Sequence, residues 1–257
     1  MPVAFVGHGS PMNAIEDNVW SRAFRDLGSR LPRPRAVLAV SAHWYTRGTA
    51  VTANERPPTI HDFGGFPEPL YEAQYPAKGD PRLADRVVSL LGAGLASTSL
   101  DWGLDHGTWS VLRHVWPLAD VPVVQLSIDG GAPASRHVEI GRSIAPLRDE
   151  DILILGSGNL VHNLGDAFGR MRSGDVTTPA WAAAFDDAVV RGLEAHDTAA
   201  LARLIESAEG RKAHPTPEHY LPLLYAAGAS GDDPVSFPIT GFDLGSLSMR
   251  AVIFGGN

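Results

Sequence analysis

Three histidines share one kind of position, just beyond a short apolar run that is typical of a buried strand. They are His8, after Val3 to Val6; His43, after Ala36 to Val40; and His162, after Ile152 to Leu155. In an open α/β sheet, ligands bind at the carboxyl ends of the strands, so we expect these imidazoles at one sheet edge. Neutral imidazole is a ligand for zinc and for iron(II). The spacing therefore predicts a metal site and leaves the metal open.

A fourth candidate ligand is His219, in "HPTPEHYLPLLYAAG". Thr216 as N-cap and Pro217 as first residue predict a helix whose first turn holds Glu218 and His219. The positive end of the helix dipole would keep the imidazole neutral and able to bind a metal. The alternative is that Glu218 complements the dipole while His219 lies at the surface.

His106 is a further candidate, between Asp105 and Gly107 in "DWGLDHGTW". With Trp102 and Trp109 nearby, it is typical of a polar group at the floor of an aromatic cavity. The alternative is a turn before a helix that begins near Thr108. His114, His137, His196 and His214 lie in helical or polar segments, where a core or surface role is expected.

Two long stretches are expected to be irregular, Asn54 to Pro76 and Gly165 to Thr178. Structureless segments of this length are often functional covers. The first is rich in glycine and aromatic residues, and we expect it to wall a pocket for a flat ligand. Its His61 and Phe63, with Trp102, are the candidate substrate-binding residues.

Composition limits the class of protein. The chain has 257 residues, no cysteine and a net charge of −8, which excludes thiolate chemistry and argues against binding to nucleic acid. No apolar run is long enough for a membrane span, and the first residues carry no basic leader, so a cytoplasmic location with no membrane partner is expected. HExxH, P-loop, GxGxxG and GxSxG motifs are absent.

The elements that must position these histidines alternate between strands and helices. Strands are expected at Val3 to Val6, Ala36 to Val40, Val121 to Ile128 and Ile152 to Leu155. Asp80 before Pro81, and Thr178 before Pro179, predict two helix starts. The alternation predicts an α/β fold: one domain over residues 1–257 around a mostly parallel central sheet with flanking helices. Antiparallel edges are expected at Thr49 to Asn54 and at the terminal "MRAVIF".

Seven blocks in the same order, running nearly from end to end, resemble a known family. They are "GHGSPMNAIEDN" (7–18), "SAHWYTRGT" (41–49), "PPTIHDFGGFPEPLYEAQYPAKGDP" (57–81), "WGLDHGTWSVL" (102–112), "VPVVQLSID" (121–129), "SGNLVHNL" (157–164) and "PTPEHYLPLLYAAGA" (215–229). Together they resemble the 4,5-DOPA extradiol dioxygenases of the class III, LigB-type ring-cleavage superfamily.

This resemblance implies one divalent metal per chain, held by His8, His43 and His219. His162 either completes a four-histidine site or acts as the catalytic base, and His106 faces the substrate. The implied substrates are a catechol such as DOPA and O2. The wider class III pattern has two histidines and a glutamate, whereas here a histidine takes the third position beside Glu218. Zinc is therefore compatible with the isolated protein, while iron(II) is what oxygen chemistry needs.

Two other functions fit the same histidines. A zinc-dependent hydrolase or lyase would use an open metal position to generate hydroxide. A non-catalytic metal-binding interaction protein would have a saturated four-histidine site. "VGHGS" also resembles the opening strand of tetrapyrrole metal chelatases, but over a few residues only. The sequence does not indicate an oligomeric state.

Overall fold

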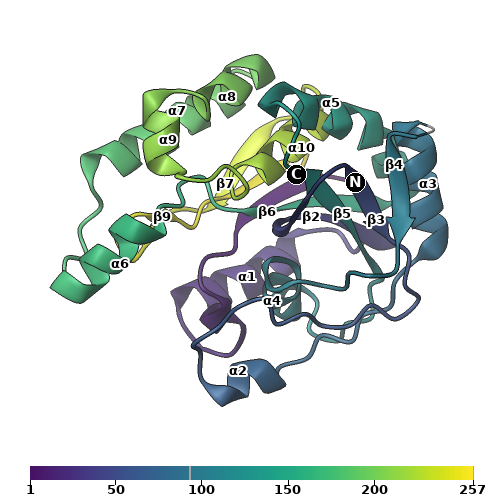
Figure 1. Ribbon diagram of the computed structural model, residues 1–257, viewed down its shortest axis with the longest axis horizontal. Helices are drawn as coiled ribbons and strands as arrows, with labels where there is room; N and C mark the ends of the chain where they lie inside the picture. Colours follow the sequence, from purple (N-terminus) through teal and green to yellow (C-terminus); the bar gives the residue numbers. More distant parts are fainter. Residues whose placement is uncertain (93, 257) are drawn as a thin grey trace.

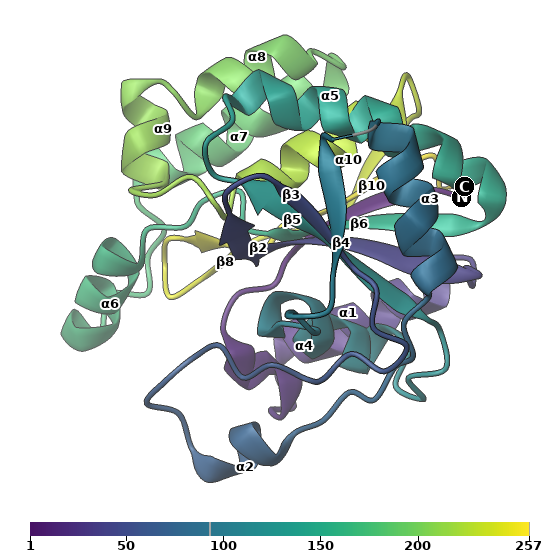
Figure 2. The same cartoon turned by 45° about the vertical axis from the view of Figure 1, so that its right-hand side comes forward.

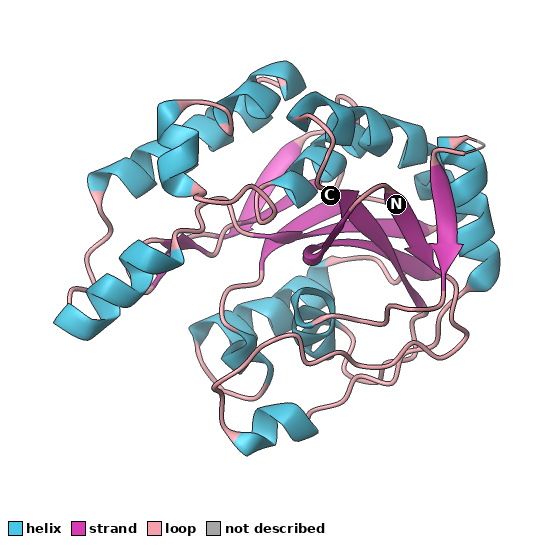
Figure 3. Ribbon diagram, viewed as in Figure 1, coloured by secondary structure: helices cyan, strands magenta, loops and turns pink. Residues whose placement is uncertain are grey.

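A twisted eight-stranded sheet runs through the centre of the molecule (Figure 3). The computed structural model describes residues 1–92 and 94–256. The strand order is β4-β3-β5-β2-β6-β1-β10-β7, and a separate two-stranded sheet pairs β8 with β9. The strands are β1 (Val3–Gly7), β2 (Ala36–Thr46), β3 (Thr49–Thr52), β4 (Ala96–Ser99), β5 (Val123–Asp129), β6 (Ile152–Gly158), β7 (Val235–Ile239), β8 (Phe242–Asp243), β9 (Leu247–Ser248) and β10 (Ala251–Phe254).

The four predicted strands are β1, β2, β5 and β6, and they form the parallel centre of the sheet. β2 pairs in parallel with both β5 and β6, and β6 pairs in parallel with β1. Both faces are buried: in β1, Val3 and Phe5 enter one apolar core, while Ala4 and Val6 enter the other. Burial on both faces explains why these strands read as continuous apolar runs. The predicted α/β fold class is confirmed.

The two predicted antiparallel strands are present, but neither is outermost. β3 runs antiparallel to β5, and β10 runs antiparallel to β1. β4 then pairs with the outer side of β3, and β7 with the outer side of β10. The prediction of edges was therefore wrong, because the short polar strand β4 and the partly exposed β7 lack the apolar pattern of a buried strand.

Helices cover both faces of the sheet (Figures 1 and 2). Residues of α3, α5 and α7 to α10 share the core that contains Phe5, whereas α1 and α4 share the core that contains Val6. The helices are α1 (Val19–Arg30), α2 (Glu68–Glu72), α3 (Pro81–Leu91), α4 (His106–Val115), α5 (Ala134–Ile144), α6 (Leu164–Ser173), α7 (Ala180–Glu194), α8 (Thr198–Leu204), α9 (Ala208–Ala213) and α10 (Leu221–Ser230), with 3-10 turns η1 (Pro11–Ala14) and η2 (Ala145–Glu150).

Of the two predicted helix starts, one is confirmed. α3 begins at Pro81, and the Asp80 side chain accepts hydrogen bonds from the backbone N–H groups of Arg82 and Leu83. α7 instead begins at Ala180, with Pro179 in the N-cap position and no side-chain cap. Thr178 therefore does not cap this helix, and that prediction was wrong by one residue.

The expectation of an irregular stretch from Gly165 to Thr178 was also wrong. Most of it forms α6, which projects from the body of the molecule (Figure 2). The Asn163 side chain accepts a hydrogen bond from the Asp166 N–H, and Gly174 ends the helix in the left-handed conformation. Of the three glycines that suggested a loop, Gly174 ends the helix, whereas Gly165 and Gly169 are tolerated within it.

Residues 54–76 follow the irregular path that the sequence indicates, apart from the single turn of α2. This segment is fixed to the body by backbone hydrogen bonds from Ile60 N–H to Leu104 O and from Leu104 N–H to Pro58 O. The indole of Trp109 donates to Ile60 O. None of the helices in residues 1–92 and 94–256 is both long enough and apolar enough to span a membrane.

Candidate metal centre

Three neighbouring parallel strands bring His8, His43 and His162 to the same end of the sheet. His8 directly follows β1, and its backbone N–H donates to Gly158 O at the end of β6. His43 lies within β2, beyond Ser41, where pairing with β6 ends, and inside an irregularity between Val40 and Tyr45. Such irregularities redirect side chains. The predicted gathering of the three histidines is therefore present.

His219 joins them from a turn rather than from a helix. Pro217 to Tyr220 form this turn, and α10 begins only at Leu221. The Thr216 hydroxyl donates to Glu218 Oε1 and does not cap a helix. The predicted placement of Glu218 and His219 in a first helical turn was therefore wrong.

Gly158 allows the His219 turn to lie directly on the end of β6. The backbone N–H of Asn159 donates to His219 O, and a Cβ atom at Gly158 would lie 2.0 Å from that same oxygen. Any side chain here would push His219 away from β6, so the position requires glycine.

His106 is the first residue of α4, with Asp105 as its N-cap, rather than part of a turn before a helix at Thr108. The next residue, Gly107, packs against the other histidines. A Cβ atom there would lie 2.5 Å from Ser41 Oγ and 2.9 Å from His43 Cδ2. The absence of a side chain at Gly107 lets the start of α4 approach the ends of β1 and β2.

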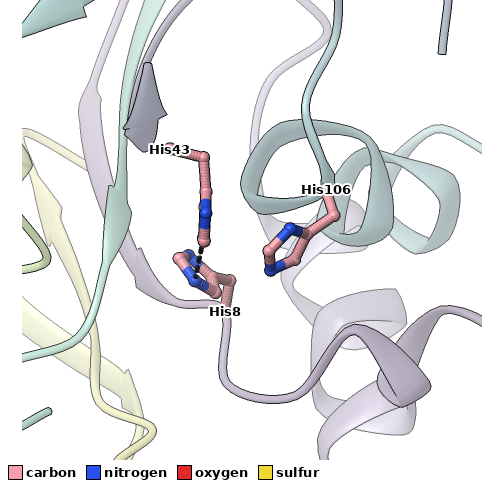
Figure 4. A group of neighbouring side chains, drawn as sticks. All are labelled: His8, His43 and His106. Carbon is pink, nitrogen blue, oxygen red and sulfur yellow. Dashed lines mark hydrogen bonds between the residues drawn. The ribbon is translucent and has the colours of Figure 1, made fainter. Parts of the chain in front are cut away.

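The five histidines form two groups that meet where His219 adjoins His8 and His43. In the first, the ligand atoms of His8, His43 and His106 lie within 4.8 Å of one another (Figure 4). The second contains His162, Glu218 and His219. The His219 ring centre is 5.3 Å from that of His8 and 5.1 Å from that of His43. All five predicted histidines are therefore neighbours.

Asp62 holds two of these rings and was not identified from the sequence. Its Oδ2 atom is 3.0 Å from His106 Nδ1 and 3.1 Å from His43 Nδ1, and its Oδ1 accepts from the His106 backbone N–H at 2.9 Å. A carboxylate only accepts hydrogen bonds, so it favours a proton on Nδ1 of both rings. We call His43, His106 and Asp62 the Asp62 side of the centre.

On the opposite side, Glu218 Oε1 lies 3.1 Å from His219 Nδ1, and the His162 ring stacks on His219 with ring centres 3.4 Å apart. We call His162, Glu218 and His219 the Glu218 side. Both carboxylates leave Nε2 as the free nitrogen of the ring that they contact.

His8, between the two sides, is oriented by a hydroxyl group. The Ser157 Oγ–H donates to Gly107 O at 2.5 Å, so the Ser157 oxygen accepts from His8 Nδ1 at 3.0 Å. The Nε2 atoms of His8 and His43 then face each other at 3.1 Å (Figure 4). Two lone pairs this close repel unless a proton or a metal ion lies between them, so this donor set fits a metal ion.

Burial keeps most of these imidazoles neutral. It lowers the pKa of His162 to about 3, with a further contribution from the neighbouring histidines, and holds the pKa of His8 and His219 well below the usual range. Burial also lowers the pKa of His106. Neutral imidazole is the form that binds a metal.

His43 is the exception. Burial opposes its protonation, but the contact with Asp62 and the charges of Asp105, Asp62 and Glu218 outweigh burial and raise its pKa. Burial likewise opposes ionisation of Asp62, yet the contacts with His106 and His43 lower its pKa. The Asp62 carboxylate therefore stays ionised, and its negative charge attracts a cation.

The candidate substrate-binding residues differ in how closely they approach the Asp62 side. The Phe63 ring packs edge-on against His106, with ring centres 5.5 Å apart. His61 donates to Ala73 O and packs on Trp109, further from the metal centre than Phe63. Trp102 stacks on Trp44. Of the three, Phe63 lies directly against the histidine cluster.

The comparisons with known proteins agree with this fold. The family model for the catalytic LigB subunit of aromatic ring-opening dioxygenase matches residues 2–253. The chain belongs to this LigB family, as its sequence motifs predicted.

Its relatives include 4,5-DOPA extradiol dioxygenases. The Escherichia coli K12 protein of that name is 50% identical over 265 residues, which cover 99% of this chain and 95% of the relative. The Beta vulgaris protein is 39% identical, over 89% of this chain and 87% of the relative. A crystal structure of an uncharacterised Escherichia coli K12 protein matches with a TM-score of 0.85 and 45% identity, covering 99% of this chain and 100% of that chain.

Proposed function

We propose that the protein is a metal-dependent extradiol dioxygenase that cleaves the ring of a catechol such as DOPA and inserts both atoms of O2. The observation that carries this proposal is the convergence of five imidazoles, most of them kept neutral by burial, beside an aromatic wall. Membership of a family of aromatic ring-opening dioxygenases and the names of the relatives support the same activity.

The metal ligands that we propose are His8, His43 and His219. Their ring centres are 5.0, 5.1 and 5.3 Å apart. Imidazoles bound to one ion through nitrogens at roughly 2.1 Å have ring centres about 4.5 to 5.3 Å apart at regular coordination angles. The three spacings support a single ion between these rings.

His162 and His106 lie too close to a proposed ligand to share the ion at such angles. The His162 ring centre is 3.4 Å from that of His219 in a parallel stack, and that of His106 is 3.8 Å from that of His43. These spacings favour His162 as the catalytic base over His162 as a fourth ligand.

We assign His162 to removal of a proton from one catechol hydroxyl. Burial keeps its imidazole neutral but lowers its pKa and so weakens it as a base, and an adjacent catecholate anion would raise that pKa and strengthen it. His106, held by Asp62, would donate to or orient the reacting oxygen atoms. Phe63 would form a wall for the flat ring, with His61 and Trp102 further out.

Iron(II), when bound, supplies the one-electron chemistry that reaction with O2 requires, whereas zinc is redox-inert. The protein's own contribution is to hold neutral imidazole ligands, to position the catechol and to take up its proton. Both oxygen atoms end in a ring-opened semialdehyde.

The test is to load metal-free protein with Fe(II) without oxygen, add L-DOPA or another catechol, and then admit air. We expect a yellow ring-opened product and consumption of one O2 per product. If no catechol in a panel gives oxygen uptake, or if zinc alone supports turnover without O2, the proposal is wrong.

His162→Ala tests the proposed base. We expect it to retain bound metal and to lose turnover by about 100-fold or more, the usual contribution of a general base. His196→Asn is the matched control, because His196 is exposed and has a positive φ of 51° that asparagine tolerates. If His162→Ala releases the metal, then His162 is a ligand.

A further inference from the structure

We propose that Asp62 is a positioning residue that holds the metal ligand His43 and the substrate-facing His106 through one carboxylate, and thereby couples metal binding to the substrate wall. The inference rests on the proposed function for the roles of the two histidines. The contacts of Asp62 with the His43 and His106 rings can be tested without measuring turnover.

A single oxygen atom serves both rings. Asp62 Oδ2 is 3.1 Å from Nδ1 of His43 and 3.0 Å from Nδ1 of His106. The second oxygen, Oδ1, accepts from the His106 backbone N–H, which fixes the carboxylate relative to the start of α4. The same group therefore sets the proton position and the ring orientation of two side chains from different elements.

The other orienting groups each hold one ring. Ser157 accepts from His8 alone, and Glu218 contacts His219 alone. Orienting partners of metal-bound histidines typically contribute 10- to 100-fold to metal affinity. Loss of Asp62 should therefore disturb a ligand and the substrate-facing histidine together, which the loss of Glu218 cannot do.

Asp62 is itself held by the loop that forms the substrate wall. The preceding residues are fixed by the hydrogen bonds from Trp109 Nε1 to Ile60 O and from His61 Nε2 to Ala73 O. The following residue, Phe63, packs on the His106 ring. Because Asp62 lies between these anchors, the orientation of the metal ligand His43 depends on the same loop that contacts the substrate.

Asp62→Asn is the most informative substitution. It keeps the shape of the side chain but replaces the carboxylate that faces Nδ1 of both His43 and His106. An amide nitrogen at the Oδ2 position donates, so it would favour Nδ1 of both rings as acceptors and place their protons on Nε2. The opposite amide orientation would place that nitrogen against the His106 backbone N–H. Neither orientation reproduces the contacts of the carboxylate.

The experiment compares Asp62→Asn with Glu218→Gln, which changes one ring, and with Asp17→Asn, an exposed carboxylate in a surface ion pair. Zn(II) competition measures metal affinity, and 15N NMR of the imidazoles reports which nitrogen carries the proton. For Asp62→Asn we expect about 10- to 100-fold weaker Zn(II) binding and altered signals for both His43 and His106. Glu218→Gln should change which nitrogen carries the proton in His219 alone, and Asp17→Asn should change it in none of these rings.

The inference is overturned if Asp62→Asn binds Zn(II) as the wild type does and keeps both rings protonated on Nδ1. If the variant does not fold, NMR of the zinc-bound wild type decides, because the inference requires Nδ1–H on both rings. A wild type that cleaves no catechol would overturn the proposed function and leave these Zn(II) and NMR results intact. If both hold, kcat of Fe(II)-loaded Asp62→Asn should fall further than its Fe(II) occupancy explains.

Discussion

The two sides of the metal centre orient their histidines by different means. On the Glu218 side, the carboxylate adjoins the histidine that it contacts in the chain. On the Asp62 side, the carboxylate lies 44 residues from His106 and reaches it only in the folded protein. The Glu218–His219 contact is therefore set by local sequence, whereas the orientation of His43 and His106 depends on the loop of residues 54–76 being in place.

His8→Ala would break both sides at once and should have the largest effect. The His8 ring adjoins those of both His43 and His219, and its removal takes away a proposed ligand rather than an orienting group. We expect metal affinity to fall by more than roughly 100-fold, beyond the usual cost of losing an orienting partner. Metal analysis after purification and Zn(II) competition check this. Retention of wild-type affinity would show that His8 is not a ligand.

Acid titration of the metal-free protein should distinguish two histidines with opposite pKa shifts. These are His214, near the Glu218 side, whose pKa is lowered, and His43, on the Asp62 side, whose pKa is raised. Burial lowers the pKa of His214, which hydrogen-bonds Leu160 O near His162, to about 4. Its folded pKa lies below its unfolded value, so its contribution to stability is complete above about pH 6.5 and is lost as the pH falls toward 4. We expect a loss of about 3 kcal/mol.

His43 should behave in the opposite way, because its pKa is raised. Its contribution is present below about pH 6.5 and is lost as the pH rises through the raised pKa. Denaturant unfolding of the wild type and His214→Gln between pH 4 and 7.5 measures the first effect, and NMR titration of His43 measures the second. Identical pH dependence in the wild type and His214→Gln would contradict the assignment to His214.

Gly107→Ala should disturb the Asp62 side by a smaller amount. The added methyl group would contact Ser41 Oγ and the His43 ring at less than 3 Å, so one of them must move. We expect a loss of about 2 kcal/mol in unfolding free energy, typical of overpacking, together with weaker Zn(II) binding. Gly169→Ala in α6 is the control, since a Cβ atom there meets nothing within 4 Å. Equal behaviour of the two variants would show that Gly107 has no role in the close approach.

The sequence predicted the parallel centre of the sheet because β1, β2, β5 and β6 are buried on both faces and carry continuous apolar runs. It also predicted that His8, His43 and His162 would meet, since this follows from adjacent parallel strands. It missed Asp62, whose neighbours in the chain give no periodic signal and whose partners come from β2 and α4. It misplaced His219, because Thr216 bonds Glu218 rather than capping a helix.

The position of β1 has a consequence for the order of events during synthesis. β1 lies between β6 and β10, so the strand that leads into His8 pairs with residues 152–158 on one side and 251–254 on the other. His8 is made well before residues 251–254, so its strand has both neighbours only after Phe254 has been made. Such long-range pairing slows folding. The centre with β1 paired on both sides is therefore complete only once the chain from His8 to Phe254 has been made.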